Sequence, residues 1–268
     1  MSTKNDKKEE NSWKSQKEPL LEVEETRKRD YFLPISILIA GVLIAGALIY
    51  STGKKTVGPA ETKKADTGLV VQAPAAIQGV EIGDSVILGD PKASVTFIEY
   101  ADYQCPFCTS FFKETEPLLI KDYVDKGNVK MVYKDFAFLD QFAGGKNESH
   151  LAAEAAACAA DQGKFWDYHD LIFKTEIADQ QANPGKSENN GNLNVEKLES
   201  LAQELGLNKN QFNSCLESNK YKDKIQKEVV EAQALGVKAT PTFFINGQKF
   251  EGALPYPQFK ATIDNLLK

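Results

Sequence analysis

The sequence predicts an α/β domain that contains a helical insertion and follows a single N-terminal membrane-spanning helix. Three observations lead to this fold class. A charge-free run fills residues 31–50, a strand–helix–strand pattern extends from Ser94 to Phe138, and strand chemistry returns at Thr242 after a long helical stretch. Because a strand–helix–strand unit favours parallel pairing within one sheet, we expect these strand regions to share a core.

The first thirty residues are highly charged. Eight Lys or Arg and eight Asp or Glu stand there among few aliphatic residues, and so little apolar surface does not offset the entropy lost on ordering. We therefore predict a disordered tail over residues 1–30. The whole chain carries a formal net charge of -6 and mixes both signs throughout. Without a basic stripe, nucleic acid is not expected as a partner.

A charge-free run of twenty residues from Tyr31 to Tyr50 follows the tail. In a helix such a run rises about 30 Å, the thickness of the hydrocarbon core of a bilayer. Pro34 falls in the first turn, where a missing N–H costs least, and both tyrosines lie at interfacial depth. The run predicts an uncleaved signal-anchor. A cleaved secretory signal is the alternative, which the long charged region ahead and the lack of a small-x-small cleavage site disfavour.

Basic residues flank both ends of the predicted anchor. Arg27, Lys28 and Arg29 precede it, whereas Lys54 and Lys55 follow at slightly greater distance. The positive-inside rule narrowly favours a cytoplasmic N-terminus, with the rest of this single-pass protein outside the cytoplasm. Residues 51–76 are rich in Lys, Thr, Ala, Gly and Pro and predict a linker to a domain over residues 77–268.

The first half of this domain follows the order strand, cysteine, helix, strand. The run Ser94–Tyr100 is typical of a mostly buried strand, and Pro106 marks the start of a helix just after Cys105. Apolar residues at helical spacing predict that this helix continues to Gly127, and Val129–Phe138 predicts the next strand.

The second half begins with a helical insertion, predicted over about residues 145–234. A Gly-, Asn- and Pro-containing stretch, residues 180–194, interrupts it and predicts a surface loop. A strand is then expected over Thr242–Ile245, followed by the hairpin dipeptide Asn246-Gly247 and a second strand. A closing helix is predicted over Tyr256–Leu267.

The pair Cys105 and Cys108 carries the predicted chemistry. A thiolate at a helix start meets unpaired N–H groups and the positive end of the helix dipole, which lower its pKa. We expect Cys105 to be the exposed, reactive sulfur. The alternative for such a pair is half of a zinc site, but Cys158 and Cys215 form no second close pair and the two histidines lack ligand spacing. No metal and no cofactor are predicted.

Three ordered motifs make the resemblance to a known family specific. Tyr103–Cys108, Asp161–Trp166 and Ala239–Gly247 are similar to motifs of the DsbA-like thiol-disulfide oxidoreductases, which have a thioredoxin fold with a helical insertion. The resemblance covers roughly residues 80–268. It implies a membrane-anchored bacterial enzyme in which Cys105 and Cys108 exchange disulfides with client proteins.

The same resemblance implies roles for residues around the pair. Thr240-Pro241 resembles the cis-proline loop that faces the cysteines and binds an extended substrate peptide. Glu99 stands where the family keeps a buried acid, which would pass a proton to or from Cys108; from the residues alone, an outward-facing position is equally open. Lys134 is a candidate charge partner for Glu99. Phe107 stands where the strongest oxidants carry a histidine, and we expect it to present an apolar face to clients.

Cys158 and Cys215 lie far from the pair, within the predicted insertion. Free buried thiols are one interpretation. Some DsbA-like proteins carry a second, non-catalytic disulfide in this block, so the resemblance implies a structural Cys158–Cys215 bridge. Such a bridge persists only in an oxidising compartment, which would favour an extracytoplasmic domain.

The predicted function is therefore the formation of disulfide bonds in exported proteins, with reoxidation by a membrane partner of the DsbB or VKOR kind. A disulfide reductase or isomerase is the enzymatic alternative, although residues 51–80 look too short and irregular for a dimerisation region. A chaperone or binding module with an inert Cys105–Cys108 bridge is the non-enzymatic alternative. A monomer is expected.

Overall fold

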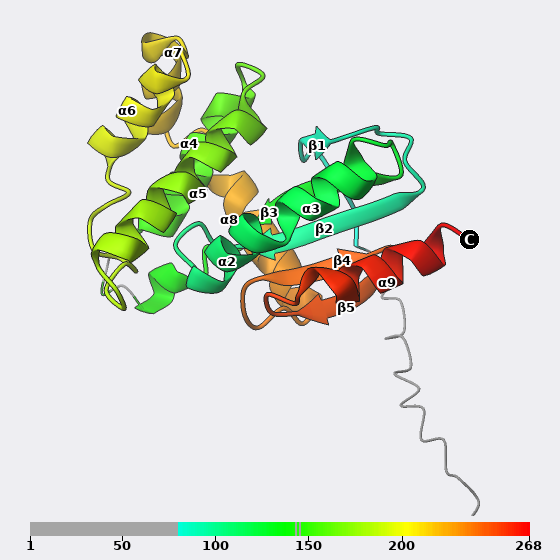
Figure 1. Cartoon of the computed structure of the whole chain (residues 1–268). Coiled ribbons are helices and arrows are strands. Elements are labelled where there is room, and N and C mark those ends of the chain that lie inside the picture. The colour runs from blue at the N-terminus through cyan, green and yellow to red at the C-terminus, as the bar shows by residue number, and fades with distance from the viewer. Residues whose placement is uncertain (1–79, 143, 145) are drawn as a thin grey trace, which may run out of the picture. The chain divides into compact units, whose positions relative to one another are not determined.

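The computed structural model describes residues 80–142, 144 and 146–268 (Figure 1). A five-stranded sheet lies at its centre, with the strand order β1-β3-β2-β4-β5. The strands are β1 (Ile87–Leu88), β2 (Val95–Ala101), β3 (Val129–Asp135), β4 (Thr242–Ile245) and β5 (Gln248–Glu251). As predicted, β2 and β3 are parallel, while the other neighbouring strands pair antiparallel.

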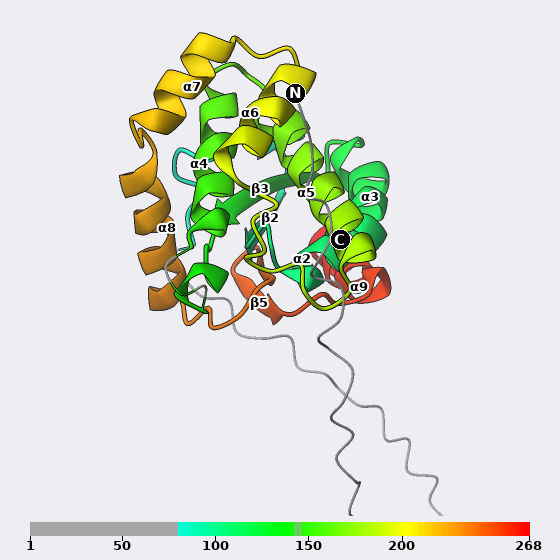
Figure 2. The same ribbon diagram turned by 90° about the vertical axis from the view of Figure 1, so that its left-hand side faces the viewer.

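Helices cover both faces of the sheet and form a separate block. They are α2 (Pro106–Glu114), α3 (Glu116–Leu119), α4 (Glu148–Ala160), α5 (Phe165–Ala182), α6 (Val195–Glu204), α7 (Lys209–Glu217), α8 (Lys222–Ala234) and α9 (Tyr256–Leu266). A π-helical turn, Ile120–Val124, continues α3, and a 3-10 turn, Leu139–Phe142, follows β3. Figure 2 shows α2, α3 and α9 on one side of the sheet and α8 on the other.

Alternating side chains of β2 divide the core between these helices. Phe97 packs with residues of α2, α3 and α9, whereas Ile98 and Tyr100 pack with α8. Because successive side chains of a strand point to opposite faces, one strand serves both layers. Glu99 shares the face of Phe97, which is the face that α2 covers.

The predicted helix after Cys105 is real, but it is not continuous. Helix α2 ends at Glu114 and α3 begins at Glu116. Pro117 has no N–H to donate to the carbonyl four residues earlier, and its ring clashes with the preceding turn, so the helix breaks there. The strand predicted to Phe138 is also shorter, because regular pairing in β3 stops at Asp135.

The later elements follow the sequence pattern closely. The predicted β4–β5 hairpin is present, and its turn residues Asn246 and Gly247 have φ values of 46° and 82°. Two positive φ values fit the type I′ turn that such a dipeptide favours. The helices α4 to α8 occupy the stretch predicted as helical, and α5 runs on to Ala182 before the loop.

The predicted tail, anchor and linker lie outside the described residues. Within residues 80–142, 144 and 146–268, no helix is both long and apolar enough to cross a membrane. The predictions for residues 1–30, 31–50 and 51–76 therefore stay predictions.

Candidate active site

Cys105 stands at the junction between β2 and α2. Its N–H donates to the Asp102 carbonyl at 3.0 Å, and the Gln104 N–H donates to Asp102 Oδ1 at 2.9 Å. These bonds shape the turn that follows the strand, and Pro106 then occupies the first helical position. Cys105 is the N-cap residue of α2, so its sulfur lies at the positive end of that helix.

The surroundings of Cys105 stabilise its thiolate. A hydrogen bond from the Cys108 thiol is the largest cause that lowers the pKa of Cys105 to about 7. Hydrogen bonds from the Thr240 side chain and from the N–H groups of Cys108 and Phe107 lower it further, whereas burial opposes the shift. A larger share of Cys105 than of an ordinary cysteine is therefore ionised at neutral pH. The thiolate is the nucleophile in disulfide exchange.

Cys108 has the opposite character. Its side chain is fully buried, and burial is the largest cause that raises the pKa of Cys108 well above its usual range, followed by the hydrogen bond and the charge of Cys105. Cys105 is thus the thiol that ionises readily and attacks, and Cys108 is the buried thiol whose protonated form is favoured. Cys105 is less exposed than the sequence predicted, at 5%, because the loop before β4 covers it.

That loop contains the predicted substrate-binding residues. The Thr240–Pro241 peptide bond is cis, and the Cys105 thiol donates to the Thr240 carbonyl at 3.4 Å. The Gly252 N–H donates to the Pro241 carbonyl at 2.8 Å and so joins the loop to the end of β5. Phe107, on the first turn of α2, is 65% exposed. The cis-proline loop and the dithiol therefore face each other, with an apolar side chain beside them.

Glu99 is buried on the same side of the sheet as the dithiol. It is 4% exposed, and no hydrogen-bond donor in the described part of the chain reaches its Oε1. Burial, followed by the negative charges of Glu116 and Cys105, raises the pKa of Glu99 well above its usual range. These effects favour the protonated form of the carboxyl and move its titration toward neutral pH. Glu99 thus has the environment of a proton donor rather than that of an outward-facing strand residue.

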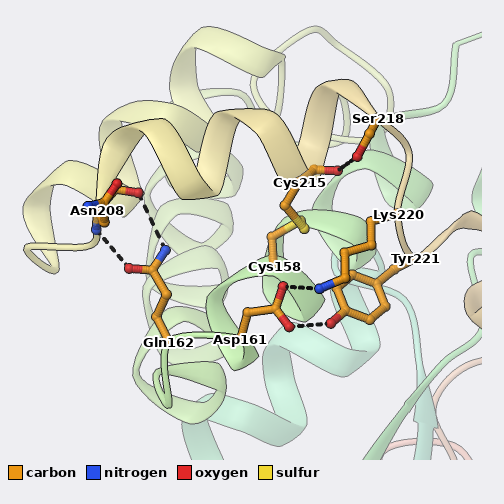
Figure 3. Close-up of a disulfide and its surroundings, with 8 residues drawn as sticks. All are labelled: Cys158, Asp161, Gln162, Asn208, Cys215, Ser218, Lys220 and Tyr221. Carbon is orange, nitrogen blue, oxygen red and sulfur yellow. Dashed lines mark hydrogen bonds and ion pairs between the residues drawn. A yellow bond between two sulfur atoms is a disulfide. The ribbon is translucent and has the colours of Figure 1, made fainter.

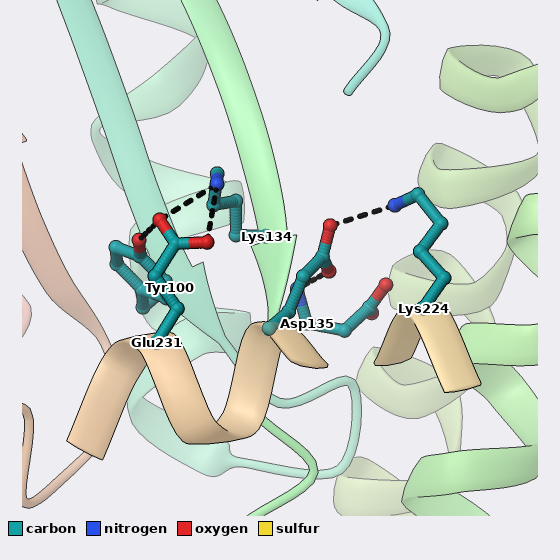
Figure 4. Close-up of polar contacts among 6 residues, drawn as sticks. Tyr100, Lys134, Asp135, Lys224 and Glu231 are labelled. Carbon is teal, nitrogen blue, oxygen red and sulfur yellow. Dashed lines mark hydrogen bonds and ion pairs between the residues drawn. The ribbon is translucent and has the colours of Figure 1, made fainter. Parts of the chain in front are cut away.

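The predicted pairing of Glu99 with Lys134 is wrong. Lys134 is in register with Tyr100, not with Glu99, so its side chain points to the opposite face of the sheet. There its Nζ lies 2.8 Å from Glu231 Oε1, and the Tyr100 hydroxyl donates to the same oxygen at 2.6 Å (Figure 4). Among the described residues, no cation is paired with the Glu99 carboxyl.

Cys158 and Cys215 are joined by a disulfide between α4 and α7 (Figure 3). Their Cα atoms are 5.8 Å apart. Polar pairs cross the same junction: Lys220 Nζ lies 2.6 Å from Asp161 Oδ2, and the Asn208 N–H donates to Gln162 Oε1 at 2.7 Å. The bridge is thus part of a larger attachment of α7 to the end of α4.

A buried polar network behind the active-site turn did not emerge from the sequence. Gln104 is fully buried, and its Nε2 donates to Glu148 Oε2 at 3.2 Å. Glu148 also accepts hydrogen bonds from the N–H groups of Gly191 and Leu193. This network connects the turn before Cys105 to the loop between α5 and α6. The sequence contains one sign of this network, since the polar residues Asp102 and Gln104 directly follow the apolar strand that precedes Cys105.

The lowered pKa of Cys105 predicts a pH dependence. Because the folded pKa is about 7, the rate of alkylation of the reduced protein by iodoacetamide should rise through a midpoint near pH 7. Cys108→Ala should move this midpoint upward, since it removes the largest cause of the shift. The measurement is the rate of Cys105 modification between pH 5 and pH 10. An unchanged midpoint in the variant would contradict the assigned cause.

Comparison with known proteins agrees with this geometry. A family model described as "Thioredoxin" matches residues 81–265. Disulfide bond formation protein D of Bacillus subtilis (strain 168) is 30% identical over 186 residues, which cover 68% of this chain and 77% of the relative. The crystal structure of oxidised BdbD from Bacillus subtilis matches with a TM-score of 0.60 and 26% identity, over 73% of this chain and 96% of that one. The crystal structure of alpha-DsbA1 from Wolbachia pipientis matches with a TM-score of 0.57 and 26% identity, over 69% and 91%.

Proposed function

Since this chain belongs to the thioredoxin family, as a DsbA-like thiol-disulfide oxidoreductase, we propose that it forms disulfide bonds in exported proteins through Cys105 and Cys108. The contrast between the two sulfurs carries the proposal: the pKa of Cys105 is lowered and that of Cys108 is raised. A disulfide that serves only as a structural bridge does not require a stabilised thiolate at a helix start, whereas disulfide exchange does.

In the proposed reaction the protein begins with a Cys105–Cys108 disulfide. A client thiolate attacks Cys105 Sγ, the Cys105–Cys108 bond breaks, and Cys108 leaves with the electron pair. A second client thiolate then attacks the client sulfur of the mixed disulfide and expels Cys105 as a thiolate. Two client thiols are oxidised to a disulfide, and the Cys105–Cys108 disulfide is reduced to the dithiol. A membrane redox partner is proposed to reoxidise this dithiol.

Glu99 is proposed to supply the proton in the first step. The departing Cys108 is buried, and a thiolate in that environment is costly. In addition to the larger effect of burial, the charge of Glu99 raises the pKa of Cys108, and the charge of Cys105 raises the pKa of Glu99, so the three groups are electrostatically coupled and a protonated Glu99 is favoured when a thiolate forms beside it. In the reverse direction Glu99 would accept the proton from Cys108.

The cis-proline loop and Phe107 are proposed to bind the client. The Thr240 carbonyl lies within hydrogen-bonding distance of Cys105, which supports a role for this backbone in binding an extended peptide next to the sulfur. Phe107 adds an exposed apolar surface at the same helix start. It offers neither the charge nor the hydrogen bond of a histidine to the thiolate, which fits a Cys105 pKa that is lowered only to about 7.

The proposed location is the outer side of a membrane, with residues 31–50 as anchor and the N-terminus in the cytoplasm. The Cys158–Cys215 disulfide supports this orientation, because such bridges persist in oxidising compartments. The charge-free length of residues 31–50 supports the anchor.

The reduction potential of the Cys105–Cys108 couple tests the proposed direction. The Cys105 pKa of about 7 matches that of thioredoxin and lies far above that of a strong oxidant, so the pKa alone does not set the direction. An oxidase requires a potential above about -270 mV, the value of thioredoxin. Equilibration of the protein with glutathione buffers, followed by quantification of the free thiols, measures it. A potential below about -270 mV would favour the reductase alternative. In a parallel assay, the oxidised protein should convert a reduced, unfolded client to its disulfide form.

A further inference from the structure

Three potential metal ligands meet between α3 and α5. Glu116 is the first residue of α3, and His169 and Asp170 are neighbours in α5. One nitrogen or oxygen atom of each lies within 4.8 Å of those of the other two, and no other group of this kind occurs among residues 80–142, 144 and 146–268. Glu116 and Asp170 also line a cavity of about 480 Å³, so the group is accessible to a small ion.

The Glu116 carboxyl is buried without a partner. Glu116 is only 3% exposed. Among the described residues, burial and the negative charge of Asp170 act on this carboxyl, and no hydrogen bond or cation does. Its oxygens are not among the enclosed, unpartnered polar atoms of the described residues, so they are open to the cavity, where water or an ion can satisfy them. The nearest groups of the cluster are another carboxylate and an imidazole, which supply no positive charge when the imidazole is neutral.

His169 is held rigidly beside this carboxyl. It is 1% exposed, and its ring packs against the rings of Tyr133, Trp166 and Phe173 at centroid distances of 4.8 to 5.0 Å. Its Nε2 is buried and has no hydrogen-bond partner in the described residues. Its Nδ1 lies 3.3 Å from Asp170 Oδ1. Packing therefore fixes the imidazole next to two carboxylates.

The spacing of His169 and Asp170 suits a tetrahedral ion. Zinc binds imidazole nitrogen and carboxylate oxygen at about 2.0–2.1 Å. Two ligand atoms at these bond lengths in a tetrahedral site are about 3.3–3.4 Å apart. The separation of Nδ1 and Oδ1 is 3.3 Å. The two atoms form a hydrogen bond at this separation, and the same spacing would suit adjacent ligands of one ion. The Glu116 ligand atom lies within 4.8 Å of both.

Lysines near the cavity repel a cation electrostatically, but they do not block the proposed ligand atoms. Lys174 Nζ lies 3.5 Å from Asp170 Oδ2, and Lys113 and Lys121 line the cavity. Lys174 contacts Oδ2, whereas His169 faces Oδ1 of the same carboxylate. The Lys174 side chain is 61% exposed, so it can turn to water when an ion binds.

We propose that Glu116, His169 and Asp170 bind one divalent cation of the zinc class, with the cavity leaving a fourth position for water. An imidazole with two carboxylates is a ligand set of borderline hardness, which favours zinc and its neighbours over calcium or magnesium. The site is separate from the dithiol, and its existence does not depend on the direction of the redox reaction.

Titration of the oxidised, untagged full chain with Zn²⁺ in detergent micelles tests this site. Oxidation keeps Cys105 and Cys108 from competing as ligands. One saturable equivalent per chain is expected, and Glu116→Gln and Asp170→Asn should each weaken binding by about tenfold or more. Asp170 is half exposed, so its variant tests the site even if a variant of buried His169 does not fold. Lys174→Gln should tighten binding.

Two matched controls should leave the affinity for Zn²⁺ unchanged. Asp167→Asn removes an exposed carboxylate from the same helix, where it pairs with Lys164, and His150→Gln removes the other histidine of the chain. The absence of saturable binding would overturn the proposal. So would an affinity that Asp170→Asn and Glu116→Gln leave intact, or one that His150→Gln weakens as much as they do.

Discussion

Replacement of Cys105 by alanine is expected to slow the reaction of the reduced protein with 5,5′-dithiobis(2-nitrobenzoate) at pH 7 by about a hundredfold or more. In wild type the ionised Cys105 attacks first. The variant leaves only Cys108, which is fully buried and whose pKa burial still raises, so it is both inaccessible to the reagent and poorly ionised at pH 7. Stopped-flow absorbance of the released thionitrobenzoate measures the rate.

The stoichiometry of the same assay distinguishes the two sulfurs. Wild type should release two equivalents of thionitrobenzoate, because Cys108 displaces the second from the mixed disulfide on Cys105. Cys108→Ala should release one and keep the other bound. Cys158 and Cys215 are already bridged, so they contribute none. A Cys105→Ala protein that reacts as fast as wild type would contradict the assignment of Cys105 as the nucleophile.

Glu99→Gln provides a matched test of the proposed proton transfer. The substitution conserves shape and leaves Cys105 in place, so release of the first equivalent should be nearly unchanged. Release of the second should slow, because Cys108 passes its proton to the ionised form of Glu99 and a glutamine cannot accept it. If both phases keep their wild-type rates and pH profiles, Glu99 has no role in proton transfer.

Removal of the Cys158–Cys215 bridge is expected to destabilise the domain by about 4 kcal/mol on the chain-entropy estimate for a closed loop of this length. The bridged residues are 57 positions apart, so the unbridged chain gains much conformational freedom on unfolding. This loss is large against the usual total of about 5–15 kcal/mol for a folded domain. Denaturant unfolding of Cys158→Ala/Cys215→Ala, followed by circular dichroism, measures it.

The single variants decide whether the bridge is formed in solution. If it is, Cys158→Ala alone should cost nearly as much as the double variant, because either substitution breaks the same bond. If the thiols are free instead, the two substitutions should each cost little and their effects should add. Additive, small losses would therefore overturn the bridge and weaken the argument for an oxidising compartment.

Much of the fold was predictable because local patterns determine its elements. The apolar run before Cys105 specifies β2, Pro106 starts α2, and Asn246-Gly247 requires the turn between β4 and β5. The break at Pro117 was also available from the sequence, since proline cannot continue the hydrogen-bond ladder. The end of β3 was not, because it depends on where the neighbouring strand stops.

The sequence by itself determined the order strand, dithiol, helix and later hairpin, because each of these depends on neighbouring residues. Only the tertiary structure decided which distant side chains meet. The register of β2 and β3 placed Lys134 beside Tyr100 and left the Glu99 carboxyl buried without a cation. Packing of α5 against the start of α3 brought His169 and Asp170 to Glu116, more than fifty residues away in sequence. Such contacts depend on strand register and helix packing, which no local pattern of the chain specifies.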